Sequence, residues 1–221
     1  MTKPRAAQIV GVIFSRADFD RAIRMRNPPD FFELRLDALA GNIESVRNRV
    51  GKLPAPLIVT ARHPQEGGAN HLSPRTRREL FLAFLPHATW IDIELRSARA
   101  MAPVLQAARA RNIRLIISFH DFRGTPSAAR LDQIARKAQS LGPSSVKIVT
   151  RTDTSQELKR LLDFFERSQR AQNVVVMGLG KLGRASRLEL ARRGCALNYA
   201  HLGTARVAGQ LSVPELRRAL R

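Results

Sequence analysis

The sequence predicts an α/β fold, a (β/α)8 or TIM barrel, because eight short apolar runs rich in Val and Ile alternate with segments of helical periodicity. The first residues of successive runs lie 23 to 33 residues apart, about the length of one βα unit. Because each connecting helix returns the chain to the same edge of the sheet, the strands are expected to be parallel and to close into a barrel. The predicted strands are residues 8–14, 31–36, 57–61, 90–95, 114–119, 145–149, 174–177 and 197–201.

The segments between the runs have the spacing of amphipathic helices. Clear examples are residues 73–86, 127–142 and 155–169, and several such segments begin with a Ser, Thr or Asp that can cap a helix. No linker or low-complexity stretch interrupts the alternation. We therefore expect one barrel domain covering residues 1–221.

The composition indicates a soluble protein. Apolar residues make up 44% of the 221 residues, and no apolar run reaches the ~18 residues that span a bilayer. The start, MTKPRAAQIVGVIF, lacks the length and the cleavage site of a secretory signal, so we interpret it as the first strand. Cys195 is the only cysteine, which leaves no internal disulfide. We expect a cytoplasmic protein without membrane contact.

The net charge of +20 raises the possibility of a nucleic-acid partner. However, 32 of the 38 basic residues are Arg, and they are spread over almost every predicted helix. One Trp and one Tyr also offer little surface for stacking bases. We expect a solvated Arg-rich surface and no nucleic-acid partner, and such a field would attract a small anionic substrate.

Charged and polar residues recur at every second position near the ends of predicted strands. Residues two apart in a strand face the same side, so each of these sets is expected to share one face. The sets are Glu33, Arg35 and Asp37; Asp92 and Glu94; and Ser118 and His120. Structural ion pairs inside the barrel are the alternative for any one of them. Several sets together favour an active site at the carboxyl ends of the strands.

Lys147 lies inside the apolar run SVKIV. Apolar neighbours and nearby cations favour the neutral amine, which can attack a carbonyl and form an iminium ion. The iminium ion acidifies the adjacent C–H, and His120, one strand away, is the expected general base. The alternative for Lys147 is an ion pair with a carboxylate inside the barrel.

The segment TARHPQEGG, after the third predicted strand, has the character of a substrate loop. Gly67 and Gly68 permit unusual backbone angles. We expect Glu66 to orient His120 or to carry its proton, and Arg62 to donate hydrogen bonds to a carboxylate or to hydroxyls. An ordinary solvated turn is the alternative.

Residues 178–183, GLGKLG, match the dinucleotide pattern G-x-G-x-x-G formally. We reject a dinucleotide site, because the region about 20 residues further on has no acidic residue at a strand end and the pattern lies in the seventh unit. Arg187, just beyond, is well placed to bind a carboxylate.

Seven short motifs occur in order along the chain. They are E-x-R-x-D at 33–37, T-x-R-x-x-x-E-G-G at 60–68, D-x-E-L at 92–95, S-x-H-D-F at 118–122, V-K-I at 146–148, M-G-x-x-G-x-x-S-R ending at 187 with one extra residue, and G-Q-x-S at 209–212. In this order the chain resembles the type I 3-dehydroquinate dehydratases of the shikimate pathway, which serves aromatic amino acid biosynthesis.

The resemblance implies a carbon–oxygen lyase that converts 3-dehydroquinate to 3-dehydroshikimate through a lysine Schiff base. It also implies a homodimer that uses no metal and no cofactor. By position, the catalytic residues would be Lys147 for the Schiff base, His120 as general acid and base, and Glu66 in support of His120. The substrate-binding residues would be Glu33, Arg35 and Arg62 at the hydroxyls and ring, and Arg187 with Gln210 at the carboxylate side.

One segment departs from the family pattern. Where the family commonly reads S-A-P-G-Q, this chain has Arg206, Val207, Ala208, Gly209 and Gln210. Arg206 has three possible roles: a further contact to the carboxylate, a position in solvent, or a narrowing of the pocket. Alternative functions are another Schiff-base barrel lyase, such as a class I aldolase, and a basic nucleic-acid-binding module.

Overall fold

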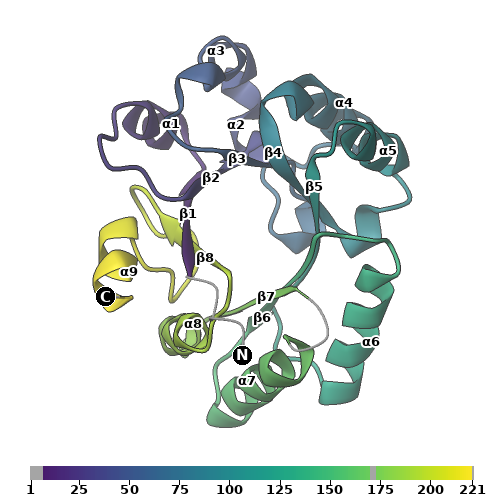
Figure 1. Cartoon of the computed structure of the whole chain (residues 1–221), viewed down its shortest axis with the longest axis vertical. Coiled ribbons are helices and arrows are strands. Elements are labelled where there is room, and N and C mark those ends of the chain that lie inside the picture. The colour runs from purple at the N-terminus through teal and green to yellow at the C-terminus, as the bar shows by residue number, and fades with distance from the viewer. Residues whose placement is uncertain (1–6, 170–172, 221) are drawn as a thin grey trace.

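The structure, a computed structural model, describes residues 7–169 and 173–220 and contains a barrel of eight parallel strands (Figure 1). The strands are β1 (Gln8–Ile13), β2 (Phe31–Arg35), β3 (Leu57–Thr60), β4 (Ala88–Glu94), β5 (Arg114–Asp121), β6 (Ser145–Arg151), β7 (Val174–Leu179) and β8 (Leu197–His201). Their order is β7-β6-β5-β4-β3-β2-β1-β8, so the barrel is nearly closed, with β7 and β8 at the seam. The predicted fold is confirmed.

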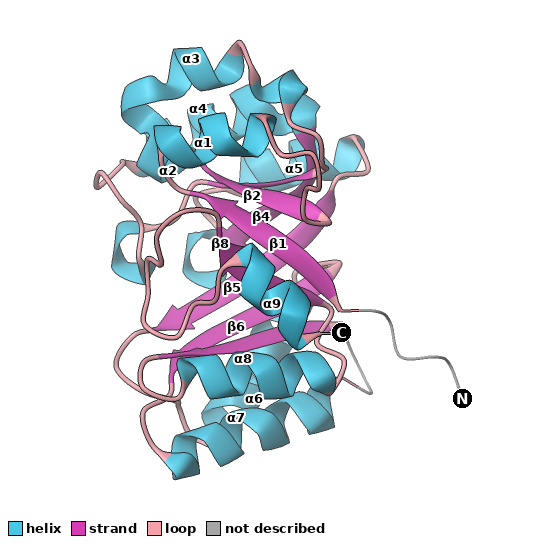
Figure 2. Cartoon of the chain, turned by 90° about the vertical axis from the view of Figure 1, so that its left-hand side faces the viewer, coloured by secondary structure: helices cyan, strands magenta, loops and turns pink. Residues whose placement is uncertain are grey.

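Helices form the outer layer around the strands, which cross the molecule obliquely in the side view (Figure 2). They are α1 (Arg16–Ile23), α2 (Leu36–Leu39), α3 (Ile43–Arg47), α4 (Pro74–Phe84), α5 (Ala102–Ala110), α6 (Ala128–Gln139), α7 (Ser155–Ser168), α8 (Gly183–Arg192) and α9 (Val213–Ala219). The side chains of Ser73, Ser127 and Thr154 each accept a backbone N–H at the start of a helix. These caps fix where α4, α6 and α7 begin.

The strand bounds differ from the sequence prediction mainly at carboxyl ends. β5 and β6 continue to Asp121 and Arg151, because their ladder pairs His120 with Val149 after the apolar pattern has ended. Conversely, β2 ends at Arg35 and the chain turns into α2, which contains Asp37. The expectation that Asp37 shares a strand face with Glu33 and Arg35 was therefore wrong.

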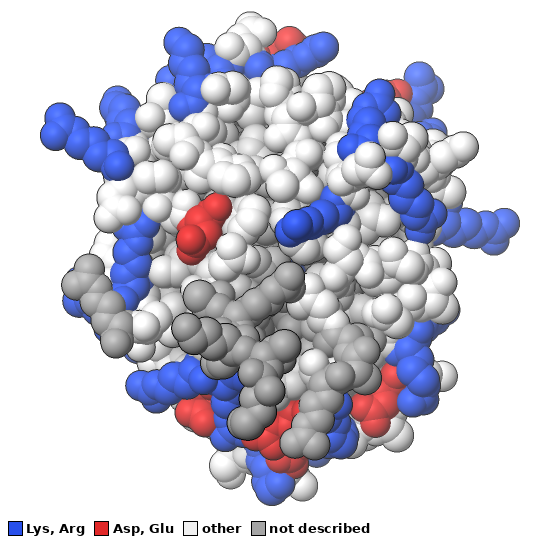
Figure 3. Space-filling model, in the orientation of Figure 1, with Lys and Arg blue, Asp and Glu red and all other residues white. Residues whose placement is uncertain are grey.

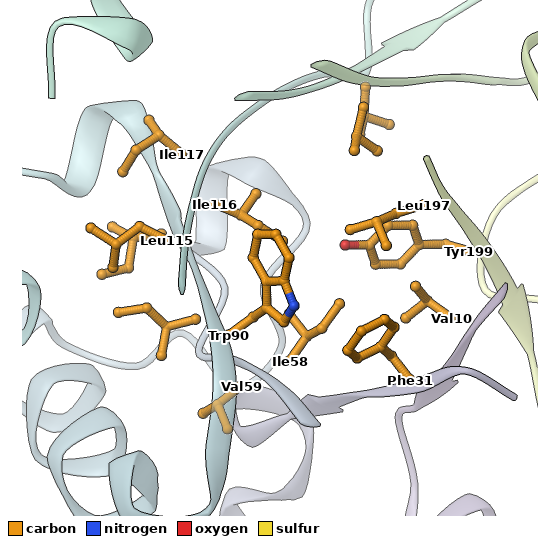
Figure 4. Close-up of a cluster of buried hydrophobic side chains, with 14 of the residues drawn as sticks. Val10, Phe31, Ile58, Val59, Trp90, Leu115, Ile116, Ile117, Leu197 and Tyr199 are labelled. Atoms are coloured by element: carbon orange, nitrogen blue, oxygen red, sulfur yellow. The ribbon is translucent and has the colours of Figure 1, made fainter. Parts of the chain in front are cut away.

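Apolar side chains fill the amino-terminal half of the barrel (Figure 4). Trp90 lies at the centre of this cluster, with Ile58 and Phe31 beside it, and all three are buried. Each precedes a polar inward residue by two positions in its strand, since β2, β3 and β4 continue to Glu33, Thr60 and Asp92. The apolar layer therefore supports a polar layer above it.

Basic side chains do not gather in one patch on the face shown in Figure 3. On this face, Lys and Arg side chains are spread around the outline, with uncharged surface between them. No helix within residues 7–169 and 173–220 is long and apolar enough to cross a membrane.

Candidate active site

A cavity of about 300 Å³ lies at the carboxyl ends of the strands and contains all the predicted site residues. These are Glu33, Arg35, Arg62, Glu66, His120, Lys147, Arg187 and Gln210. The remaining lining includes Phe14, Phe122, Val149, Met177, Tyr199 and Arg206. A cavity of about 470 Å³ at the opposite end of the barrel contains none of the predicted residues, so volume alone does not identify the site.

Lys147 points into the barrel and is 3% exposed. Its Nζ lies 2.9 Å from Asp92 Oδ2, 3.5 Å from Glu33 Oε1 and 3.8 Å from the centre of the Tyr199 ring. The expected nearby cation is Arg62, which shares Asp92 Oδ2 with Lys147, and the alternative expectation, an ion pair with a carboxylate inside the barrel, is also met. In the free protein Lys147 forms ion pairs with two carboxylates, because β2 and β4, which do not neighbour β6 in the sheet, bring Glu33 and Asp92 to it across the barrel interior.

Arg62 orients the carboxylate that holds Lys147. Its Nη1 and Nη2 donate to the two oxygens of Asp92 at 3.0 and 2.8 Å, and Ser118 Oγ donates to Oδ1 at 2.6 Å. Although burial opposes ionisation, the charges of Arg62 and Lys147 hold the pKa of Asp92 well below its ordinary value. Asp92 is thus a fixed negative charge beside the amine.

The charged network continues out of the barrel to Arg77 of α4, which is 1% exposed. Arg77 Nη2 donates to Glu94 Oε2 at 2.5 Å, and Nε donates to the carbonyl of Ala61 at 2.7 Å. The other Glu94 oxygen accepts the backbone N–H of His63 at 2.9 Å and Nη1 of Arg62 at 3.3 Å. This chain of contacts fixes Arg62 at the end of β3.

His120, which is partly buried, and Glu66, which is buried, form a hydrogen-bonded pair. Glu66 Oε2 accepts the backbone N–H of His120 at 2.9 Å and lies 3.0 Å from its Nδ1. Burial, Arg62 and Lys147 hold the pKa of His120 well below its ordinary value, so the imidazole is neutral. Burial raises the pKa of Glu66 to about 7. When Glu66 is ionised, Nδ1–H donates to it and the lone pair of Nε2 is available as a base.

The loop that contains Glu66 is tied to β2 and α2. Asp37 binds Arg35 through both oxygens at 3.0 and 2.8 Å and accepts the backbone N–H of Ala69 at 2.9 Å. A Cβ at Gly68 would lie 2.3 Å from the carbonyl oxygen of Arg62, so a side chain does not fit there. The glycine and the carboxylate together place Glu66 against His120.

Arg187 is a buried cation without an acidic partner among the described residues. It is 6% exposed, its Nη1 donates to the carbonyl of Tyr199 at 3.0 Å, and its Nε has no hydrogen-bond partner in that part of the chain. Burial lowers the pKa of Arg187 to about 10. A guanidinium in this state favours an anionic ligand, because the ligand would replace lost solvation.

Gln210 is held by the segment between β8 and α9. Its Oε1 accepts the backbone N–H of Arg206 at 2.9 Å, and both residues line the cavity. The Arg206 guanidinium lies 4.6 Å from the centre of the Phe14 ring and its side chain is 40% exposed. Arg206 is therefore at the mouth of the cavity.

Sequence reasoning missed three contributors. Asp92 was noted as an inward residue, but its contact with Lys147 joins residues 55 positions apart and leaves no local signal. Tyr199 was included in a strand without a role, although its period of two from Leu197 indicates an inward position. Phe14 follows β1 directly and has no distinguishing pattern.

The comparisons with known proteins agree with the motif resemblance. A family model described as Type I 3-dehydroquinase matches residues 11–221. The 3-dehydroquinate dehydratase of Thermococcus gammatolerans is 35% identical over 215 residues, covering 96% of this chain and 97% of that protein. The protein of the same name from Methanothermobacter thermautotrophicus is 32% identical over 195 residues, covering 86% of this chain and 84% of that protein.

Solved structures show the same fold. The type I 3-dehydroquinate dehydratase of Clostridium difficile matches with a TM-score of 0.86 at 23% identity, over 98% of this chain and 92% of that chain. The 3-dehydroquinate dehydratase of Geobacillus kaustophilus matches with a TM-score of 0.84 at 25% identity, over 99% and 90%. The fold and the expected enzyme class, a dehydratase, are confirmed.

Proposed function

We propose, since the chain belongs to the type I 3-dehydroquinase family, that it eliminates water from 3-dehydroquinate through a Schiff base at Lys147. The observation that carries the proposal is that a lysine amine and an arginine guanidinium line the same cavity of about 300 Å³. This cavity holds a lysine amine that can bind a ketone and a buried guanidinium, Arg187, that lacks an acidic partner among the described residues. The substrate has both matching groups, a ring ketone and a carboxylate.

Schiff-base formation begins with the loss of a proton from Lys147. The neutral amine attacks the ketone carbon, and loss of water from the adduct leaves an iminium ion. Asp92 and Glu33 lie 2.9 and 3.5 Å from Nζ, so deprotonation removes the positive charge that pairs with them. The iminium ion restores that charge, and the carboxylates therefore favour the covalent intermediate over the neutral amine.

The iminium ion acidifies the neighbouring C–H bond. His120 Nε2 takes this proton, and the C–H electrons move into the iminium system to give an enamine. The enamine then expels the hydroxyl on the next carbon, which leaves as water with the proton from His120. Hydrolysis of the remaining imine releases 3-dehydroshikimate and regenerates Lys147. Glu66 holds His120 in the required tautomer.

The remaining polar residues are proposed to position the substrate. Arg187 binds the carboxylate and Gln210 contacts the same side. Glu33, Arg35 and Arg62 contact the hydroxyls and ring. Because Arg62 already donates to Asp92, Glu94 and Ser118, we propose that it acts largely by holding Asp92 beside Lys147.

We also propose a homodimer, formed by a single domain of residues 1–221, that acts in the cytoplasm in aromatic amino acid biosynthesis without metal or cofactor. The support for this context is the family resemblance. Sedimentation equilibrium of the purified protein tests the dimer directly, and a monomer mass at micromolar concentration would contradict it.

Turnover tests the proposed reaction. Purified protein is incubated with 3-dehydroquinate, a panel of other keto-acids and sugar phosphates, and formation of the conjugated enone is followed by absorbance. We expect turnover of 3-dehydroquinate and no cleavage of sugar phosphates. Cleavage of a sugar phosphate without dehydration would favour the class I aldolase alternative. Tight, steeply salt-dependent binding to random DNA, with no turnover, would favour a nucleic-acid-binding module.

A further inference from the structure

Two guanidinium groups share one aromatic ring at the mouth of the cavity. The guanidinium carbons of Arg35 and Arg206 lie 5.0 and 4.6 Å from the centre of the Phe14 ring, and all three residues line the cavity. An aromatic face attracts a cation, so the ring gives both guanidiniums a defined position. The mouth therefore carries a concentration of positive charge.

Only one of these two cations is hydrogen-bonded to a carboxylate. Arg35 binds both oxygens of Asp37 at 3.0 and 2.8 Å and donates to the carbonyl of Gly67 at 2.9 Å. These contacts occupy Nε and Nη2 of Arg35 before any ligand arrives. Arg35 is therefore part of the wall that holds the Glu66 loop.

Arg206 has no comparable partner in the described part of the chain. The nearest carboxylate oxygen, Asp18 Oδ2, is 3.8 Å from its Nη2, which is beyond hydrogen-bond distance. That oxygen already accepts Ser15 Oγ at 2.8 Å and the backbone N–H groups of Ser15 and Phe14 at 3.0 and 3.3 Å, as part of the cap of α1. The donors of Arg206 remain available to a ligand.

The backbone of Arg206 ties it to the binding residues. Its N–H donates to Gln210 Oε1 at 2.9 Å, which fixes the segment between β8 and α9 and leaves the Nε2 donors of Gln210 for other contacts. Deep in the same cavity lies Arg187, whose Nε also lacks a partner among the described residues. The cavity thus has two arginines, Arg187 at its base and Arg206 at its mouth, that are not hydrogen-bonded to a carboxylate among the described residues.

We propose that Arg206 is a specificity-determining residue, which supplies a second guanidinium to the carboxylate side of the bound substrate. The proposal rests on the proposed function, and it selects the first of the three roles open to Arg206. The guanidinium leaves the face of Phe14 or tilts on it, and donates to the anionic group as the substrate enters. Two arginines, Arg187 and Arg206, then bind the anionic group of the substrate ring. The family pattern has a small hydroxyl residue at the position of Arg206.

The test compares steady-state kinetics with 3-dehydroquinate for four proteins: the wild type, Arg206→Ser, Arg206→Lys and the matched control Arg111→Ser. Arg111 is an exposed residue outside the cavity, and its replacement changes the net charge by the same amount. We expect Arg206→Ser to raise KM roughly tenfold, the effect of losing one charge-assisted hydrogen bond, with kcat changed less than about twofold. Arg206→Lys should be intermediate, because it keeps the charge and loses the fork.

Salt gives a second readout. The KM of the wild type should rise with NaCl concentration, and the slope should fall in Arg206→Ser and stay unchanged in Arg111→Ser. An unchanged or lowered KM in Arg206→Ser would overturn the proposal, as would an equal rise in KM in the two serine variants. Wild-type turnover, measured first, tests the proposed function by itself; once turnover is present, the KM ratios between the variants test the role of Arg206 alone.

Discussion

The two halves of the barrel interior use the same strands for opposite purposes. In the amino-terminal half, Phe31, Ile58 and Trp90 pack as an apolar cluster (Figure 4). Two residues further along the same strands, Glu33, Thr60 and Asp92 form a polar layer that surrounds Lys147. A shift of one inward position therefore separates the residues that stabilise the fold from those proposed to carry the chemistry.

The largest expected effect comes from removing the amine of Lys147 from the polar layer. Lys147→Met should lower kcat/KM at least roughly 10³-fold, because no other lysine among the described residues lines the cavity to form the proposed Schiff base. Steady-state assays measure the loss, and circular dichroism checks that the variant is folded. Lys137→Met, on the exposed side of α6, is the matched control and should retain wild-type activity. Substantial activity in Lys147→Met would show that the chemistry lies elsewhere.

The corresponding substitution in the apolar layer removes the side chain of Trp90. Trp90→Ala should lower the free energy of unfolding by about 3–5 kcal/mol, through lost burial and a cavity, with kcat nearly unchanged where the protein is folded. Trp90→Phe should cost much less, because the indole N–H has no hydrogen-bond partner among the described residues. Urea denaturation measures both. If Trp90→Ala abolished kcat in fully folded protein, the two layers would not be separable.

The smallest expected effect concerns Glu66 and His120, the hydrogen-bonded pair at the edge of the polar layer. Above pH about 7, the ionised Glu66 accepts Nδ1–H and leaves Nε2 of His120 as a base; below it, the protonated Glu66 donates to Nδ1 and Nε2 carries the proton. Hence kcat/KM should fall as the pH falls below about 7. Glu66→Gln keeps an acceptor for Nδ1–H, so it should remove this acidic limb and lower kcat about tenfold.

A pH–rate profile of Glu66→Gln that kept the acidic limb of the wild type would assign that limb to another group. The pH dependence of the stability has the opposite sign to that of kcat/KM. The raised pKa means that folded Glu66 holds its proton more tightly than the unfolded chain does. The contribution of Glu66 to stability is therefore lost as the pH rises from 4.5, the ordinary pKa of this group, towards 7. Glu66→Gln should weaken that dependence.

The strands and the inward residues could be predicted because both follow from a period of two along short apolar runs. This rule placed Glu33, Arg35 and Asp92 inside the barrel before any contact was known. It failed for Asp37, because the rule continues a strand that the chain ends at Arg35. The partners of Lys147 could not be predicted for a different reason. The contacts between inward residues depend on the stagger of strands that are far apart in the sequence.

Arg206 illustrates the other limit. The sequence showed a long cation in a segment after the last strand, and three roles remained open. Its position depends on Phe14, at the opposite end of the chain, and on the occupied state of Asp18. The capping of α1 by Ser15 and Asp18 is a local pattern, but the approach of Arg206 to Phe14 and Asp18 arises only when β1 and β8 pair.

The central claim is that Lys147 forms a Schiff base with the substrate, and reductive trapping tests it most directly. The protein is incubated with 3-dehydroquinate and sodium borohydride, and the intact mass and a peptide map are then recorded by mass spectrometry. We expect a mass increase equal to the reduced ligand, located on Lys147, and its absence in Lys147→Met. Turnover with an unmodified Lys147, or a label on another lysine, would contradict the account.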